Sequence, residues 1–258
     1  MSYVDLHCHL LPGVDDGAPS LEHAVAHARR LAGEGVRDVA VTPHVNSIWA
    51  LDVCSIPARV HELTTELAAE GLGGVRLHAG GELAHERAAD LGDEELALIA
   101  QGPPPARWLL VEAPFAGIST DFVAALDDLR RRGFGALIAH PERAAGLARD
   151  GMERLRPLLA SGALLQVNVC SLLGQHGLEV QEQAVRLLRG GLAHVLASDG
   201  HPGTREHTLG LGFHLALRAG ASSLQGWRLT QDNPRFLLRH GIPSGSPAMP
   251  PGAERVAV

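Results

Sequence analysis

The chain has 258 residues, of which 45% are hydrophobic, and a formal net charge of −7. This length and composition can build one sizeable core, so we expect a single domain over residues 1–240 and a disordered Pro/Gly-rich tail over residues 241–258. No apolar run approaches the roughly 18 residues that span a membrane. The acidic balance argues against nucleic-acid binding, because the only basic run, at 130–132, is typical of an exposed helix end.

The amino terminus and the cysteines point to a cytoplasmic protein. The first apolar run begins by residue 3, which leaves no room for a signal peptide. Cys8, Cys54 and Cys170 are odd in number and irregular in spacing, as is common in a reducing compartment. We therefore expect neither secretion nor membrane insertion.

Seven short apolar runs follow one another along the chain, and each ends in residues able to bind a metal ion or a phosphate. In chain order they end at His7 and His9, at His44 after Val36–Thr42, at Glu82 after Val75–Ala79, at Glu112 after Trp108–Val111, at His140 after Ala136–Ala139, at Cys170 after Ala163–Val169, and at Asp199 and His201 after His194–Ala197. A single polar residue at a strand end commonly just meets solvent. Seven in succession favour a shared site.

Segments with helical apolar spacing separate these runs. The clearest are Leu21–Leu31, Phe122–Leu129 and Val180–Leu188. Alternating helices and nearly continuous apolar strands predict an α/β fold with a parallel sheet covered by helices. Successive runs begin roughly 30 residues apart, which favours a β/α barrel of seven or eight units, in which the carboxyl ends of the strands converge on one face.

The pair His7 and His9 sits at the end of the first run. Residues two apart on a strand face the same way, so both imidazoles can approach one ion while Cys8 points to the other side. Two surface histidines on an edge strand would give the same pattern. The later polar strand ends favour the metal interpretation.

The chain contains no lysine, since all 22 basic residues are arginine. This excludes a Walker-type phosphate loop, a Schiff-base lysine and a carbamylated lysine that bridges metals. Thiol-based phosphoester chemistry fails on spacing, because the sixth residue after each cysteine is Val14, Val60 or His176 rather than arginine. We interpret the cysteines as small packing residues.

The chemistry therefore depends on histidines and carboxylates, a ligand set that suits manganese, iron or zinc. The expected metal ligands are His7, His9, Asp16, His44, Glu82, Glu112, His140, Asp199 and His201. Nine groups exceed the needs of one ion, so we expect two or three divalent ions, about 3.5 to 4 Å apart, with Glu82 as a bridge. Without cations, so many converging carboxylates would repel one another.

Several stretches resemble, in order, the PHP (polymerase and histidinol phosphatase) superfamily, and within it the capsule-type, metal-dependent tyrosine-protein phosphatases of bacteria (CpsB/YwqE-like). They are residues 7–18 (HCHLLPGVDDGA), Thr42-Pro43-His44, Gly81-Glu82, Val111-Glu112, His140-Pro141-Glu142-Arg143, Gln166-Val167, Ser171-Leu172-Leu173-Gly174 and Ser198-Asp199-Gly200-His201. The resemblance covers about residues 1 to 240. Its specific parts are the Leu-Pro-Gly-x-Asp-Asp-Gly and His-Pro-Glu-Arg stretches.

The resemblance implies a distorted seven-stranded (β/α) barrel of PHP type, with a site of three metal ions, usually manganese. It implies hydrolysis of phosphotyrosine on a tyrosine autokinase of capsule or exopolysaccharide synthesis. It also implies that the nine residues above bind metal and that Arg143 and Arg205 bind the substrate phosphate. A planar guanidinium suits that role, because it offers two donors to phosphate oxygens. Separately from the resemblance, protonation of the leaving oxygen is expected to be a secondary contribution, because a phenolate departs with modest help, and His201 or a metal-bound water is the candidate donor.

Some alternatives remain open. Arg143 could instead pair with Glu142, and Arg205 could lie at a solvated helix start. Two positions depart from the family pattern, since Val45 stands where a second histidine is common and the stretch from His201 to Arg205 is about one residue short. A phosphatase of a small phosphomonoester such as histidinol phosphate, or a catalytically silent metal-binding partner protein, would use the same ligands.

Overall fold

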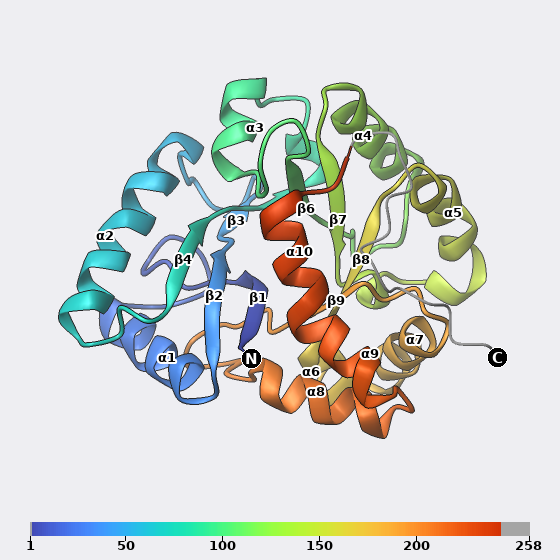
Figure 1. Ribbon diagram of the computed structural model, residues 1–258. Helices are drawn as coiled ribbons and strands as arrows, with labels where there is room; N and C mark the ends of the chain where they lie inside the picture. The colour runs from blue at the N-terminus through green and yellow to red at the C-terminus, as the bar shows by residue number, and fades with distance from the viewer. Residues whose placement is uncertain (1, 244–258) are drawn as a thin grey trace.

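The computed structural model describes residues 2–243 and contains parallel strands at the centre with helices around them (Figure 1). The strands are β1 (Tyr3–Cys8), β2 (Val36–Val41), β3 (His44–Val45), β4 (Arg76–Ala79), β5 (Glu82–Ala84), β6 (Trp108–Glu112), β7 (Gly135–Ala139), β8 (Leu164–Asn168) and β9 (Val195–Ala197). Every strand pairing in this described part is parallel, so the predicted parallel α/β fold is confirmed.

The strands form two sheets, one in the order β1-β2-β4 and the other in the order β3-β5-β6-β7-β8-β9. Strands β2 and β4 match the second and third predicted runs, and each is followed, after a short break, by a strand that sequence analysis did not predict, β3 or β5. Pro43, which has no amide hydrogen for a ladder, separates β2 from β3. Gly80 and Gly81 separate β4 from β5, and a Cβ on Gly81 would lie 2.9 Å from the Val45 side chain.

The two sheets do not close into one continuous ladder. Between β1 and β9 there is a single bridge, Cys8 with Gly200, beside a register irregularity in β1. The Asp5 carboxylate spans this gap, since its Oδ1 accepts hydrogen bonds from the backbone amides of Ser198 (3.1 Å) and His7 (3.3 Å). Together with the backbone hydrogen bonds from the Asp199 amide to the His7 carbonyl and from the His9 amide to the Gly200 carbonyl, both 2.9 Å, this side chain joins β1 to the β9 segment where the predicted seven-stranded barrel would close.

Helices cover the outside of the sheets (Figure 1). They are α1 (Leu21–Gly33), α2 (Ile56–Ala69), α3 (Asp93–Ile99), α4 (Thr120–Arg131), α5 (Met152–Ala160), α6 (Val169–Leu173), α7 (Leu178–Arg189), α8 (Leu209–Arg218), α9 (Ser223–Trp227) and α10 (Asn233–His240). The three predicted helices lie within α1, α4 and α7. Ser20 and Ser119 cap α1 and α4 by accepting hydrogen bonds from the amides of His23 and Phe122.

The core has two parts. A large outer cluster packs the helices against the strands and includes Cys8. A smaller cluster joins strand residues such as Leu6 and Trp108 to Leu237 of α10, which crosses over the strands in Figure 1. The Trp108 indole donates a hydrogen bond to the Leu237 carbonyl at 3.1 Å. We infer that α10 fixes the end of the sheets opposite the strand carboxyl ends.

The cysteines differ from one another in burial. Cys8 and Cys170 are buried, as expected of packing residues, but Cys54 is exposed beside the start of α2, so the packing interpretation is wrong for that residue. It lies in a short 3-10 turn, Val53–Ser55, where the Asp52 side chain accepts a hydrogen bond from its amide.

At the carboxyl end, Ile242 is buried and its amide donates to the Ala106 carbonyl at 2.8 Å, although it falls within the predicted tail. The remainder of that predicted tail, 244–258, lies outside the described residues. Among residues 2–243, no helix has both the length and the apolar character needed to cross a membrane.

His194, just before β9, gives the fold a pH dependence. The Leu165 amide donates to its Nδ1 at 3.1 Å, and burial lowers the pKa of His194 to about 4. The unfolded chain, with a histidine pKa near 6.5, therefore binds more protons between these values. Stability is complete above pH 6.5 and falls as the pH drops towards 4, by about 3 kcal/mol for this group.

We predict that His194→Gln flattens the acid side of the stability profile. The free energy of unfolding, measured by urea titration at pH 7 and pH 4.5, should change less with pH in the variant than in the wild type. His61→Gln, at an exposed position of α2, is the matched control and should keep the wild-type profile. Parallel profiles for wild type and His194→Gln would contradict this assignment.

Candidate metal centre

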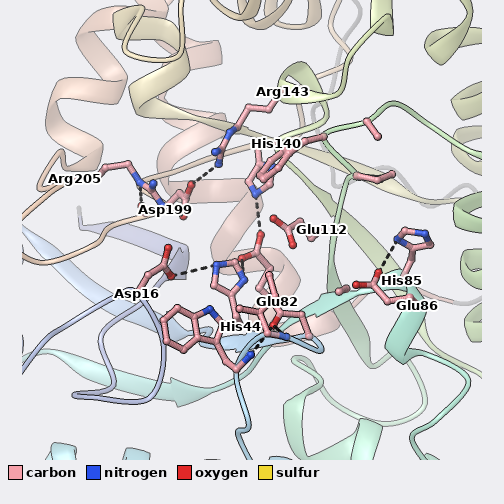
Figure 2. A pocket seen from close by; sticks show the side chains of 17 residues that line it. Asp16, His44, Glu82, His85, Glu86, Glu112, His140, Arg143, Asp199 and Arg205 are labelled. Carbon is pink, nitrogen blue, oxygen red and sulfur yellow. Dashed lines mark hydrogen bonds and ion pairs between the residues drawn. The ribbon is translucent and has the colours of Figure 1, made fainter.

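A cavity of about 540 Å³ opens at the carboxyl ends of the strands. Six of the nine predicted metal ligands line it together with both predicted phosphate-binding arginines, and Figure 2 shows these side chains turned towards one another. The eight residues are Asp16, His44, Glu82, Glu112, His140, Arg143, Asp199 and Arg205. The other three ligands, His7, His9 and His201, are buried. The predicted convergence of the strand ends is therefore present.

His7 and His9 point to one place, as their spacing predicts. Their Nε2 atoms lie 3.1 Å apart, while Cys8 packs in the outer core. The His7 Nε2 atom is 3.4 Å from Glu82 Oε2 and 3.5 Å from Asp199 Oδ1. The corresponding distances from His9 Nε2 are 3.3 and 3.5 Å. The two imidazoles thus share both carboxylates.

Glu82, the first residue of β5, lies at the centre of the cluster. His140 Nε2 is 2.8 Å from its Oε1, and His44 Nδ1 is 3.1 Å from its Oε2. Burial alone would raise the pKa of this carboxyl, but the charge on His7 and the hydrogen bond from His140 hold that pKa well below its usual range. Both oxygens of Glu82 therefore face nitrogen donors, as expected of a bridging ligand.

Asp16 closes the cavity from the loop that follows β1. Its Oδ1 lies 3.4 Å from His44 Nε2 and 3.3 Å from His201 Nε2. Hydrogen bonds from those two histidines lower the pKa of Asp16 far below its usual range. Asp16, His44, His201 and His9 offer ligand atoms that all lie within 4.8 Å of one another.

Glu112, the last residue of β6, completes another such group with His44 and Glu82. Burial, followed by the negative charge of Glu82, raises the pKa of Glu112 to about 7. A bound cation would remove that penalty and ionise Glu112 fully.

Asp199, in the turn that follows β9, is held by cationic and amide groups. Arg143 Nη1 donates to its Oδ2 at 3.3 Å and Arg205 Nη2 donates to its Oδ1 at 3.3 Å, as drawn in Figure 2. Arg143 thus pairs with Asp199, and the Glu142 carboxylate instead accepts a hydrogen bond from the Asn168 amide. The short stretch between His201 and Arg205 still brings Arg205 to the cavity.

Two of these residues have strained backbones. His140 and Asp199 adopt φ values of 34° and 49°, in the left-handed region that residues other than glycine seldom occupy. Such strain persists where the surrounding structure enforces it, and it concentrates at functional sites. Here it turns both side chains into the cavity at the ends of β7 and β9.

The structure also shows residues that contact the predicted ligands and that sequence analysis did not assign. Asp15 Oδ2 is 2.8 Å from His9 Nδ1 and accepts a hydrogen bond from the His44 amide at 2.9 Å. Gln166 Oε1 is 3.0 Å from His7 Nδ1. Asp15 and Gln166 lie within the motif stretches, so a search for partners of the second imidazole nitrogen could have found them.

Asn168 is a further orienting residue. Its Nδ2 donates to Asp199 Oδ2 at 2.7 Å, and its Oδ1 accepts from Gln166 Nε2 at 2.7 Å. It therefore links the residue that orients His7 to the carboxylate of Asp199. In the sequence, the only signal for this contact is that Asn168 lies at the end of an apolar run.

The donor set fits divalent cations. Five imidazoles and four carboxylates surround a small volume in which His140 Nδ1 is buried without a hydrogen-bond partner. Mixed nitrogen and oxygen ligands without thiolate suit zinc, iron or manganese.

A family model described as capsular polysaccharide synthesis, CpsB/CapC, matches residues 3–235. The chain belongs to the CpsB/CapC family. The resemblance drawn from the sequence motifs is thereby confirmed.

Relatives within this range carry phosphatase names. The chain is 29% identical over 201 residues to a putative tyrosine-protein phosphatase CapC of Staphylococcus aureus, covering 77% of this chain and 76% of the relative. It is also 29% identical over 204 residues to the tyrosine-protein phosphatase YwqE of Bacillus subtilis, covering 77% of each.

Solved structures show the same fold. One from the study of YwqE from Bacillus subtilis and CpsB from Streptococcus pneumoniae, described as metal-dependent tyrosine phosphatases, aligns with a TM-score of 0.77 at 24% identity, covering 96% of this chain and 98% of the other. A histidinol phosphate phosphatase from Lactococcus lactis aligns with a TM-score of 0.52 at 13% identity, covering 86% and 95% of the two chains.

We predict that Asp15→Asn weakens cation binding without displacing a ligand. The amide can no longer stabilise the His9 imidazole as an anion does, and loss of such a partner typically costs about 10- to 100-fold in metal affinity. Competition with a chromogenic chelator for Mn²⁺ measures the effect. Asp127→Asn, on the exposed surface of α4, should leave the affinity unchanged, and equal affinities in both variants would contradict the orienting role.

Proposed function

We propose that this CpsB/CapC-family protein is a metal-dependent phosphomonoester hydrolase that acts as a protein-tyrosine phosphatase. The observation that carries the proposal is the convergence of nine imidazole and carboxylate groups with two arginines on one cavity. The phosphatase names of two relatives across three quarters of the chain support the same activity.

The ligand groups suit two or three divalent cations, and we propose manganese first, with iron or zinc as alternatives. His7, His9, Glu82, His140 and Asp199 would hold cations on the inner side of the cluster. Asp16, His44, Glu112 and His201 would hold them on the outer side, and Glu82 would serve both. When bound, the cations would supply Lewis acidity and a nucleophile near neutral pH.

Arg143 and Arg205 would bind the phosphate group of the substrate. Both side chains are largely buried and reach into the cavity beside Asp199, so their donors face the place where phosphate oxygens would lie. Guanidinium groups held in place in this way would stabilise the charge that develops in the transition state.

His201 would act mainly as a metal ligand. It is buried and, within the described chain, is not among the residues that line the cavity. Burial and the charge of His9 lower its pKa. Protonation of the leaving phenolate would be a minor contribution, because a group with a pKa near 10 departs with modest help.

The two buried cysteines do not suit a thiol mechanism. Burial raises the pKa of Cys170 to about 12 and that of Cys8 well above its usual range. A buried thiol of this kind is a poor nucleophile near neutral pH.

The physiological substrate would be a phosphotyrosine protein, and we propose a tyrosine autokinase of capsule or exopolysaccharide synthesis. The family description supports a role in capsular polysaccharide synthesis, and the names of the relatives support phosphotyrosine as the target group. The free cysteines of the described chain suit the cytoplasm, which we propose as its location.

We further propose that the two sheets together represent a distorted seven-stranded barrel, in which β2 with β3 and β4 with β5 each count as one interrupted strand.

We predict that removal of metal abolishes hydrolysis of p-nitrophenyl phosphate and that added Mn²⁺ restores it. His7→Ala and Glu82→Ala should lose both bound metal and turnover, because each removes a proposed ligand. Joint replacement of Cys8, Cys54 and Cys170 by alanine should keep most of the activity. Elemental analysis by X-ray fluorescence, paired with the assay, measures both properties, and activity that survives exhaustive chelation would overturn the proposal.

We predict that Arg143→Ala keeps its metal content but raises KM and lowers kcat. The loss in kcat/KM should be about 2 to 4 kcal/mol, the usual scale for one charged donor in a preorganised site. Arg143→Lys should recover only part, because an ammonium lacks the planar fork. Steady-state kinetics on a phosphotyrosine peptide measure the effect, and wild-type kinetics in Arg143→Ala would refute a phosphate-binding role. Arg205→Ala is expected to behave similarly.

A further inference from the structure

Three large apolar side chains line the same cavity beyond the metal ligands. Phe115 and Ile48 are 50% and 80% exposed, and Trp49 lies beside Ile48 in the cavity wall. A single exposed hydrophobic side chain needs no functional explanation, but three that gather at one pocket favour a binding role. No step in the proposed chemistry uses them.

Phe115 lies next to the proposed phosphate-binding group. The Arg143 guanidinium sits 4.4 Å from the centre of its ring, and the His140 ring stacks with it at 5.9 Å and 28°. A substrate whose phosphate contacts Arg143 would therefore bring its ester group close to the exposed part of Phe115.

The backbone holds Phe115 in this position. The Ala145 amide donates to the Phe115 carbonyl at 2.9 Å, and Gly117, at a φ of 115°, turns the chain directly afterwards. A Cβ on Gly117 would lie 2.8 Å from the Ala145 carbonyl oxygen, so only glycine permits this close approach. The backbone that carries the ring is therefore fixed beside the cavity.

Ile48 and Trp49 are presented by an equally defined turn after β3. The Asn46 side chain accepts hydrogen bonds from the Ile48 amide at 2.9 Å and from the Trp49 amide at 3.1 Å. This Asx turn fixes the backbone of both residues without using their side chains. The two side chains are thus free to contact a ligand in the cavity.

We propose that Phe115, Ile48 and Trp49 form an aryl-binding wall that makes this site select phosphate esters of phenols over those of alkyl alcohols. Apolar and aromatic surfaces bind a flat ring well, whereas the short aliphatic chain of phosphoserine would leave them uncovered. The inference rests on the proposed phosphatase function and assigns its substrate preference to residues outside the metal cluster.

The test compares Phe115→Ala with wild type on two peptides of the same sequence, one with phosphotyrosine and one with phosphoserine. For the phosphotyrosine peptide, kcat/KM should fall about 5- to 100-fold, the range for losing one aromatic stacking contact, while for phosphoserine it should change less than about threefold. Phe115→Trp should keep the preference. The double variant Ile48→Ala with Trp49→Ala should also reduce the preference for the phosphotyrosine peptide.

Leu178→Ala, at a 77% exposed leucine outside the cavity, is the matched control and should keep both rates. Metal content is measured in every variant. Equal losses on both peptides in Phe115→Ala would overturn the proposal, because Phe115 would then act only by supporting Arg143.

Binding of phenylphosphonate and methylphosphonate to the Mn²⁺-loaded protein, measured by calorimetry, separates this inference from the phosphatase proposal. Wild type should bind the phenyl compound more tightly, and Phe115→Ala should lose that preference. Failure of wild type to hydrolyse either peptide would refute the proposed function alone. Equal affinity of wild type for the two phosphonates would refute the aryl-binding wall.

Discussion

Two buried carboxylates, Glu82 at the start of β5 and Asp199 just after β9, impose the constraint around which the cavity is organised. Glu82 and Asp199 have almost no contact with solvent, and an uncompensated buried carboxylate is costly. The chain surrounds them with donors, including His140 at Glu82 and Arg143 at Asp199. The same oxygens are ligands that divalent cations favour. The negative charge of Glu82 and Asp199, which the fold must balance, is therefore also the charge that would bind metal ions. Metal binding would in this way stabilise the folded protein.

Interruptions in the sheets let ligands from distant strands meet. A regular ladder would have continued β2 into β3 and β4 into β5, whereas Pro43 and the glycine pair before Glu82 break both strands at the same level. Where the ladder between β1 and β9 is incomplete, Asp5 of β1 accepts a hydrogen bond from the Ser198 amide that follows β9. His140 and Asp199 likewise depart from regular backbone geometry. Each adopts a strained left-handed conformation that turns its side chain into the cavity.

The sequence was sufficient to predict elements defined by local patterning. Apolar runs with polar ends located the principal strands, and the i, i+2 spacing placed His7 and His9 on one side. Features that depend on contacts distant in sequence were missed. Asn168 bonds to Asp199 across adjacent strands, and Arg143 pairs with Asp199 rather than with its neighbour Glu142. The short strands β3 and β5 were also missed, because they depend on close packing between Gly81 and Val45, which periodicity alone does not reveal.

The cavity has a polar part, formed by the predicted metal ligands, and an apolar part, the aryl-binding wall. Arg143 contacts both parts. One face of its guanidinium lies against the Phe115 ring while Nη1 reaches Asp199. Packing against an aromatic ring lowers the conformational entropy that a long side chain loses on binding phosphate. A change at the wall can therefore weaken phosphate binding indirectly, and it would do so equally for every ester. A contact between the wall and the substrate, in contrast, has an effect that depends on the leaving group. The contribution of Phe115 is therefore measured by the ratio of kcat/KM for two substrates rather than by either rate alone.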